Sequence, residues 1–493
     1  MGQRFLRWFT TRRLAGAILF VALFAMAVRA PVDTDTWWHL QAGRVTVETG
    51  QILQIDRFSH TRYGSAWINH SWLSQVVLYG LFNRFAYAGL GVWIGAVVTA
   101  TFGLVYVQMS GDVFTRAFIL VLAAATSAVI WVARPQLLSF LLTAAVAYVI
   151  YLFKWRQVNR LWLLPPIFIL WVNLHAGYAL GFMLLVAFVV GEAFNHLLAW
   201  MGLPREAPVV RWRGIALVVG IALLSVLLLV INPYTTRMWT YYLDTVGIGA
   251  LQDYIQEWQS PDFHPLHTQP FIWFLLLLLG AIGLSGQGID GTDLSMVAMF
   301  VYASLLAGRN FAPFALVTAP VLSRHVSGIW KRLDLGRRVR RARHRPWMGA
   351  VNLVVLSVLL LLAGLKAAQP LSAEFNAAQQ RESLPVEAVD WIRRHDPPRE
   401  LFNPYNWGGY LIWSLYPEYR VFVDGRTDLY GDRLLRRYLT VEFGREGYRE
   451  ILDEHEVETV LTYAEGPLSI RLACSADWER VYEDGMAAIW VRR

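Results

Sequence analysis

Two aspartates one residue apart, Asp33 and Asp35, follow directly after the first apolar segment of the chain. In an extended stretch residues i and i+2 point to the same side, so both carboxylates can meet one cation, one guanidinium or one hydroxyl proton. If the two lie close together, their repulsion raises one pKa and makes that carboxylate a competent base. The alternative is that Asp35 caps a helix that begins near Thr36. We expect a catalytic pair, with Asp35 as the first candidate base and Asp33 as the second.

Two arginines stand at the ends of apolar segments with few other charges nearby, Arg134 in the sequence ARPQ and Arg309 in GRNF. A guanidinium offers parallel donors to a phosphate, so arginine suits the recognition of a charged lipid phosphate. The alternative is that each side chain extends to the lipid headgroups at the membrane surface. Both readings stay open, and we include both arginines among the candidate substrate-binding residues.

Three histidines and one glutamate complete the candidate substrate-binding set. His39 follows two tryptophans, His70 begins an amphipathic segment, and His175 lies at the boundary of an apolar segment in WVNLHAGY. Glu257 lies in the connection 232–270, which is long for a simple connector, and long loops of this kind often cover sites. The alternatives are a packed or hydrogen-bonded histidine and a solvated carboxylate.

The composition indicates that the chain carrying these residues is a membrane protein. Of the 493 residues 56% are hydrophobic and only 16% are charged, and the mean hydropathy is +0.39. Such a chain is too apolar for a soluble protein, and a helical crossing needs about 20 apolar residues.

The single cysteine, Cys474, excludes an intrachain disulfide. Apolar runs predict eleven crossings, at residues 14–30, 90–109, 114–132, 136–153, 161–174, 178–200, 215–231, 271–284, 294–307, 311–322 and 351–365.

Basic residues concentrate at the ends of apolar segments, at residues 4–13, 154–160, 205–213 and 324–345. The positive-inside rule predicts that these segments and the N-terminus are cytoplasmic. With eleven crossings, the candidate site residues and the C-terminal region then share the opposite side. Segment 71–85 is predicted to lie along the outer surface, because counting it as a crossing would break this pattern. Membrane orientation also accounts for the net charge of +8, so membrane lipids are expected as partners and nucleic acid is not.

After residue 371 the composition changes to that of a water-soluble mixed domain of about 120 residues. We therefore expect a polytopic α-helical transmembrane domain over 1–370, which includes the outer loop 31–73, and a small extracytoplasmic α/β domain over 371–493. Gly408 and Gly409 predict a turn flanked by aromatic residues, and Asp424 with Gly425 predicts an ordinary turn after a strand. The alternative is that the aromatic and polar residues of these two segments contact a sugar ring or grip an acceptor above the membrane site. The residue pattern predicts helices at 385–394 and 445–455, and strands at 419–423, 457–463, 478–482 and 487–491.

The first outer loop resembles that of the GT-C glycosyltransferases, which include protein O-mannosyltransferases and the lipid A aminoarabinose transferases. The resemblance rests on the acidic pair after the first apolar segment, the aromatic and small residues 37–43, the turn 64–67 from Gly to Trp, and the polar element around His70. Those families typically have an Asp-Glu pair followed by a Tyr, and later an element of the His-Pro-Pro-Leu type. This chain has Asp33-Thr34-Asp35 and Asn69-His70-Ser71 in their places, so the match is one of superfamily architecture.

The resemblance implies an enzyme of the bacterial inner membrane that acts in the cell envelope. It implies an inverting hexosyltransferase, of mannosyltransferase-like type, that uses a polyprenyl-phosphate-linked sugar donor and a glycan, lipid or protein acceptor. A loop carboxylate would deprotonate the acceptor hydroxyl. Some members hold a divalent cation, Mg²⁺ or Mn²⁺, on the acidic residues, which would be Asp33 and Asp35 here, and others need no metal.

Two further function classes stay open on the sequence alone. One is a non-enzymatic transporter or assembly protein for lipid-linked glycans or polysaccharide, which an inverted repeat or several charged residues at helix centres would favour. The other is a related enzyme that attaches a different lipid-linked group at the outer face.

Overall fold

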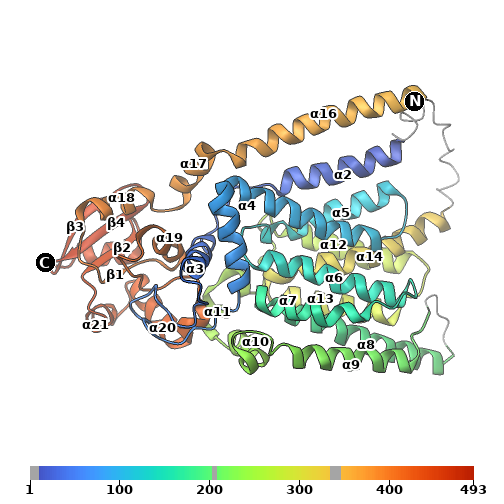
Figure 1. Ribbon diagram of the computed structural model, residues 1–493, viewed down its shortest axis with the longest axis horizontal. Coiled ribbons are helices and arrows are strands. Elements are labelled where there is room, and N and C mark those ends of the chain that lie inside the picture. The colour runs from blue at the N-terminus through green and yellow to red at the C-terminus, as the bar shows by residue number, and fades with distance from the viewer. Residues whose placement is uncertain (1–9, 203–207, 334–345) are drawn as a thin grey trace.

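The computed structural model describes residues 10–202, 208–333 and 346–493. The predicted basic segments 4–13, 205–213 and 324–345 therefore lie partly outside the described residues. The chain forms a bundle of helices that run in roughly the same direction, with a smaller mixed part of helices and strands at one end (Figure 1). The predicted helical body with a small C-terminal α/β part is confirmed.

The bundle is built from apolar helices, and each predicted apolar segment overlaps one of them. Among the described residues, five helical stretches are long and apolar enough to cross a membrane: Trp72–Gln108, Val113–Ile130, Gln136–Lys154, Ala176–Trp200 and Trp347–Leu371. The bundle helices are α2 (Thr11–Ala27), α4 (Trp72–Gln108), α5 (Val113–Ser127), α6 (Gln136–Lys154), α7 (Leu164–Leu174), α8 (Ala179–Trp200), α9 (Trp212–Leu228), α12 (Gln269–Leu284), α13 (Gly291–Leu306), α14 (Phe311–Arg332) and α16 (Pro346–Leu371).

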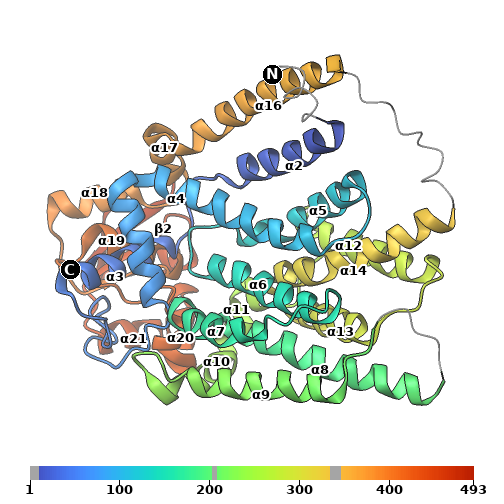
Figure 2. The same ribbon diagram turned by 45° about the vertical axis from the view of Figure 1, so that its right-hand side comes forward.

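Helix α4 is broken at Ala86, whose φ of 48° and ψ of −141° are not helical. The part of α4 before the break lies across the end of the bundle, beside α3 (Thr36–Thr49), and the part after it runs with the other helices (Figures 1 and 2). Gly43 of α3 allows this contact, because a Cβ there would overlap the carbonyl oxygen of Gln75. The break therefore brings residues 72–85 and α3 to the same end of the bundle as the C-terminal part.

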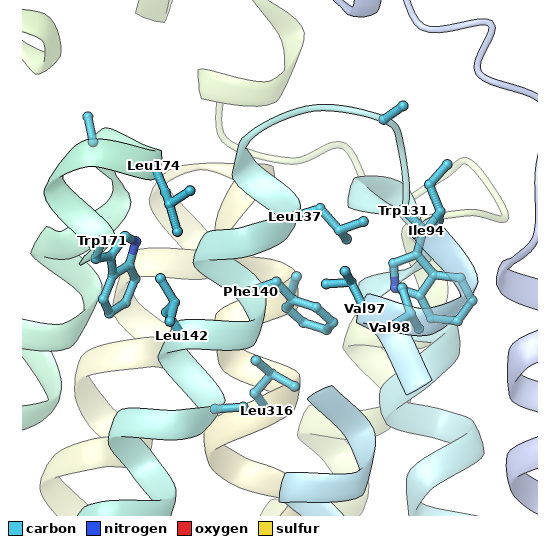
Figure 3. Packing of buried hydrophobic residues seen from close by; sticks show 14 of the residues in the cluster. Ile94, Val97, Val98, Trp131, Leu137, Phe140, Leu142, Trp171, Leu174 and Leu316 are labelled. Carbon is cyan, nitrogen blue, oxygen red and sulfur yellow. The ribbon is translucent and has the colours of Figure 1, made fainter. Parts of the chain in front are cut away.

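The core beneath that end is made of aliphatic and aromatic side chains from different helices (Figure 3). Val98 of α4, Phe140 of α6 and Leu316 of α14 are all at most 2% exposed. Trp171 of α7 is fully buried, and its indole N–H donates to Ser139 Oγ at 2.7 Å. Burial of these large side chains fixes the helix ends from which several polar site residues project.

The opposite end of the bundle holds its own buried charges. Lys154, the last residue of α6, pairs with Glu192 of α8 and with Asp290 before α13. Arg324 of α14 forms a two-point contact with Asp293, with Nε 3.1 Å from Oδ2. Each charge has an opposite partner, so the cluster links four helices without leaving a buried ion unpaired.

The C-terminal part contains a four-stranded sheet in the order β1-β2-β4-β3, in which β1 is parallel to β2 and the other pairs are antiparallel. Its helices lie around this sheet. The elements are α17 (Ala373–Ser383), α18 (Val386–His395), β1 (Leu401–Phe402), α19 (Tyr405–Leu415), α20 (Thr427–Glu442), α21 (Tyr448–Glu454), β2 (Thr459–Tyr463), α22 (Pro467–Ala473), β3 (Trp478–Glu483) and β4 (Ala487–Arg492).

Two local predictions for this part are wrong. The pair Gly408-Gly409 forms no turn but lies inside α19. A Cβ on Gly408 would overlap the carbonyl oxygen of Val423, and one on Gly409 would overlap that of Thr34. The glycines therefore serve close packing. The predicted strand 419–423 forms only isolated bridges, one of them between Val421 and Ser59 of the first outer loop.

The first outer loop and the C-terminal part are joined by a buried ion cluster. The guanidinium of Arg426 binds Asp56 Oδ1 through Nη1 at 2.6 Å and Asp424 through Nε at 2.8 Å. The side chains of all three residues are fully buried. Burial raises the pKa of Asp56, but Arg426 and hydrogen bonds outweigh it and hold that pKa below its ordinary value. Two segments 370 residues apart in sequence are thereby fixed against each other.

Candidate active site

A cavity of about 560 Å³ opens where the first outer loop, the helix ends and the C-terminal part meet. The structure brings seven of the eight sequence-predicted site residues to its wall, and the eighth, Asp33, contacts two of the seven, Asp35 and Arg134. The residues that line the cavity include Asp35, His39, His70, Arg134, His175, Glu257 and Arg309.

The acidic pair meets a guanidinium. Asp33 pairs with Nε of Arg134, and Asp35 Oδ2 lies 3.1 Å from Nη1 of the same arginine. Asp33 Oδ1 also accepts the backbone N–H of Asp35 at 3.0 Å, which fixes the turn between them. Asp35 does occupy the position before α3, but its side chain makes no capping hydrogen bond. The helix-cap interpretation therefore does not account for its carboxylate.

The carboxylate of Asp35 is held from two sides. The indole N–H of Trp38 donates to Oδ1 at 3.1 Å, and the backbone of Gly425 from the C-terminal part packs against the same oxygen. Burial raises the pKa of Asp35 to about 6; Arg134 opposes this shift and the charge of Asp33 adds to it. A carboxylate with this pKa is largely ionised at neutral pH and still basic enough to accept a proton.

The substitution Gly425→Ala is expected to reduce any reaction that depends on Asp35 by about 100-fold, because misplacement of a reacting group by 1 Å has an effect of this order. A Cβ at position 425 would lie far closer to Asp35 Oδ1 than the 3.0 Å that real Cβ atoms keep. Turnover by the purified variant is the measurement. Gly485→Ala is the matched control, since a Cβ at Gly485 has no atom within 4 Å; equal activity of the two variants would contradict the contact.

Two histidines of the cavity wall are fixed as neutral donors. Nδ1 of His39 lies 3.2 Å from the amide nitrogen of Gln75, so it accepts and Nε2 carries the proton. Nδ1 of His175 accepts from the backbone N–H of Gly177 at 3.1 Å and faces Ser139 Oγ at 2.8 Å. Burial lowers the pKa of both histidines well below the ordinary value. Among the described residues no hydrogen bond engages Nε2 of either imidazole, so each Nε2–H can donate to an oxygen-rich ligand.

The third histidine belongs to a chain of polar contacts that reaches the C-terminal part. Nδ1 of His70 is 2.7 Å from the hydroxyl of Tyr241, which in turn interacts with the carboxyl of Asp428. Burial raises the pKa of Asp428 and lowers that of His70. All three side chains line the cavity. This series of contacts can hold a proton that is shared among His70, Tyr241 and Asp428.

Glu257 and Arg309 form the other side of the cavity. Glu257 Oε2 is 3.8 Å from Nη1 of Arg134, and its Oε1 is 3.9 Å from Nη1 of Arg309. The guanidinium of Arg309 stacks over the ring of Trp258 at 4.0 Å from the ring centre. No carboxylate in the described part of the chain lies closer to Arg309 than Glu257, so the donors of Arg309 remain more available to an anionic ligand than those of Arg134.

The residues present do not fit the expected site for a divalent cation. Within the described ranges, no group of three or more His, Cys, Asp and Glu side chains is arranged to hold a metal ion. The oxygens of Asp33 and Asp35 that would bind Mg²⁺ or Mn²⁺ instead face the guanidinium of Arg134.

The sequence favours ordinary turns for the C-terminal segments that prove to line the cavity. Tyr405, Asn406, Thr427 and Asp428 line it, together with Gly425. These residues come close to Asp35 only because the domain docks on the first outer loop, and no local pattern reveals that contact. The segment DGRTD supplies Gly425, Thr427 and Asp428, although its sequence favours an ordinary turn over a contact with a sugar.

Comparisons with solved structures show which fold this is. The chain is similar to the oligosaccharyltransferase of Archaeoglobus fulgidus in its apo form, with a TM-score of 0.56 and 12% identity over 93% of this chain and 70% of that one. The same enzyme tethered to an acceptor peptide containing the NVT sequon gives a TM-score of 0.57 and 12% identity, over 99% and 75%. ArnT from Cupriavidus metallidurans in the apo state gives 0.51 and 14%, over 96% and 97%.

The chain has the GT-C fold. The resemblance inferred from the first outer loop is thereby confirmed at the level of architecture. No family model matches the chain, and no curated protein sequence does. The GT-C likeness therefore lies in the arrangement of helices and C-terminal part, with very little of the sequence shared.

Proposed function

We propose that the chain is a GT-C membrane glycosyltransferase that transfers a sugar from a polyprenyl-phosphate donor to an acceptor hydroxyl. The observation that carries the proposal is the placement of Asp35, a half-buried carboxylate with a pKa raised to about 6, in a polar and aromatic cavity that also contains Arg309. The fold is shared with an oligosaccharyltransferase and with ArnT, which supports the same class of reaction.

The reaction needs one base and one stabilised leaving group. Asp35 accepts the proton of the acceptor hydroxyl as the hydroxyl oxygen attacks the anomeric carbon of the sugar. The bond between that carbon and the phosphate oxygen breaks on the opposite face, and polyprenyl phosphate leaves with the electron pair. This displacement inverts the anomeric configuration. The guanidinium of Arg309 offsets the negative charge that develops on the phosphate.

The remaining wall of the cavity suits a sugar ring. Trp67 and Tyr405 offer aromatic faces to the C–H groups of a sugar, and the Nε2–H groups of His39 and His175 offer donors to its hydroxyls. The acceptor is a glycan, lipid or protein hydroxyl. We assign His70, Arg134 and Glu257 to the same substrate-binding wall, with the last two acting mainly on the charge around Asp35.

We further propose the orientation that the charge pattern predicts. The eleven apolar helices cross the membrane, the N-terminus and the basic ends lie in the cytoplasm, and residues 371–493 lie outside. The buried charges Lys154 and Asp290 are then at the cytoplasmic end, and the cavity opens at the outer face of a bacterial inner membrane. This arrangement places the site where a donor anchored in the outer leaflet can reach it.

The direct test uses purified protein in nanodiscs with radiolabelled polyprenyl-phosphate sugars and a cell-envelope extract as the source of acceptors. We expect label to move from the lipid to an acceptor, with release of polyprenyl phosphate. Tight binding of the labelled donor with no chemistry in any acceptor fraction would contradict the proposal and favour a transporter or an assembly protein.

Arg309→Ala is expected to weaken donor binding by about tenfold to a hundredfold, which corresponds to the loss of a charge-assisted hydrogen bond of about 1.5–3 kcal/mol. The measurement is the KM for the donor at saturating acceptor. Arg116→Ala is the control, because that arginine lies near the start of α5 at the far end of the bundle, over the ring of Tyr106. A KM in Arg309→Ala equal to that of the control would remove Arg309 from the phosphate site.

A further inference from the structure

Arg134 lies among three carboxylates that come from two different outer segments. Its Nε pairs with Asp33, and its Nη1 lies 3.1 Å from Asp35 Oδ2 and 3.8 Å from Glu257 Oε2. The side chains of Arg134, Asp33 and Asp35 are only 17%, 15% and 21% exposed. Water therefore screens these charges weakly, and the carboxylates depend on the guanidinium for a counter-charge.

The backbone holds Arg134 in this position. The hydroxyl of Thr36, the first residue of α3, donates to the carbonyl oxygen of Ala133 at 3.3 Å. The N–H of Arg134 donates to the carbonyl oxygen of Val132 at 2.8 Å, and its own carbonyl accepts from Leu137 at the start of α6. The segment that carries Arg134 is thus tied both to α6 and to the helix that follows the acidic pair.

The geometry around Arg134 is that of a cation site filled by a side chain. Carboxylate oxygens are the ligands that Mg²⁺ and Mn²⁺ prefer. A guanidinium also suits them, because its planar fork directs several N–H groups toward carboxylate oxygens at once. The three carboxylates with Arg134 and Arg309 leave one net negative charge when all are ionised. Without Arg134 the deficit would equal the charge of one divalent cation.

We propose that the guanidinium of Arg134 is the built-in cation of this site. It stands between Asp33, Asp35 and Glu257 where a divalent cation would otherwise bind, and it positions Asp35 without any metal. The effect of Arg134 on sugar transfer rests on the proposed function. The replacement of a metal ion by the guanidinium is argued from the contacts of Arg134 alone. The three carboxylates surround the guanidinium and, among the described residues, are not arranged to hold a metal as they stand. Removal of the guanidinium is expected to let them close on a Mn²⁺ ion, because their charges then have no counter-charge between them.

The test measures Mn²⁺ binding to the purified full-length chain. The electron paramagnetic resonance signal of free Mn²⁺ reports how much of the ion remains unbound. We expect Arg134→Ala and Arg134→Gln each to bind one Mn²⁺ per chain more than the wild type. Arg134→Lys keeps the positive charge and is expected to gain none. Adding Asp33→Asn and Glu257→Gln to Arg134→Ala is expected to remove the gained Mn²⁺. Size-exclusion profiles confirm that each variant is folded.

Two results would overturn the inference. One is a wild-type chain that binds a Mn²⁺ which Asp35→Asn removes, and the other is the absence of any gain in both Arg134→Ala and Arg134→Gln. The first of these results comes from the wild type and Asp35→Asn and needs no Arg134 variant. It can therefore overturn the inference even if the Arg134 variants misfold. Transfer provides a second readout: the wild type is expected to keep full activity in EDTA, and Arg134→Ala is expected to lose activity and regain part of it with Mn²⁺.

The binding arms contain no donor lipid, so they separate the two proposals. A wild type without transferase activity contradicts the proposed function alone. Either of the two Mn²⁺-binding results that overturn the inference contradicts the role of Arg134 and leaves the proposed function untouched.

Discussion

Asp35→Asn is expected to lower sugar transfer by about 10²–10⁴-fold, the usual contribution of a positioned general base. Asparagine keeps the size of the side chain and the hydrogen bond from Trp38, so expression and membrane insertion should stay near those of the wild type. Asp33→Asn should have a smaller effect, because Asp33 acts through Arg134 and the Asp35 backbone. Glu48→Gln on the exposed side of α3 is the control and should change nothing.

The pH profile separates loss of a base from loss of structure. Asp35 works in its ionised form, and its pKa is about 6. As pH falls through this value the carboxylate is protonated, so the rate of the wild type should fall on the acid side, by about tenfold for each further pH unit. The residual rate of Asp35→Asn should lack this acid limb. An acid limb of the same shape in both proteins would assign the titration to a group other than Asp35.

Arg426→Gln is expected to weaken the docking of the C-terminal part on the first outer loop by about 3–5 kcal/mol, the usual effect of breaking a buried ion cluster. Loss of the guanidinium leaves the carboxylates of Asp56 and Asp424 buried without a counter-charge. Because Gly425 holds Asp35 from the same segment, transfer should be lost together with docking. The measurement is the unfolding temperature in detergent combined with limited proteolysis of the first loop.

The matched control for this variant is Arg436→Gln. Arg436 also forms two ion pairs, with Asp253 and Asp432, but its side chain is 47% exposed. Exposed pairs contribute about 0–1 kcal/mol, so the control should unfold close to the wild type. If both variants have the same unfolding temperature and the same protease pattern, the buried cluster does not hold the domains together.

The grouping of polar residues from separate connections could be predicted from sequence. Successive crossings alternate in direction, so the number of crossings between two connections decides whether they lie at the same end of the bundle. Arg134, Glu257 and Arg309 stand in three separate connections that the count of crossings puts on one side, and the structure brings them to one cavity. The partner of each charge could not be predicted. The sequence suggested a phosphate for Arg134, whereas its nearest partners in the structure are Asp33 and Asp35.

For the C-terminal part the sequence favours turns over site contacts, and the Gly-Gly turn is wrong for a different reason. Glycine pairs usually mark turns, but Gly408 and Gly409 are used for close approach of α19 to the segment after Phe422 and to the first outer loop. Such contacts join residues hundreds of positions apart, and a local pattern carries no information about them. The same holds for Asp428, which reaches the cavity only because the docked domain covers it.

The most direct measurement is a cryo-EM map of Asp35→Asn in nanodiscs with a bound polyprenyl-phosphate sugar. The account predicts that the sugar occupies the cavity with its anomeric carbon facing position 35 and its phosphate beside Arg309. Donor density outside this cavity, or a phosphate on the far side of the bundle beside Lys154 and Arg324, would contradict it.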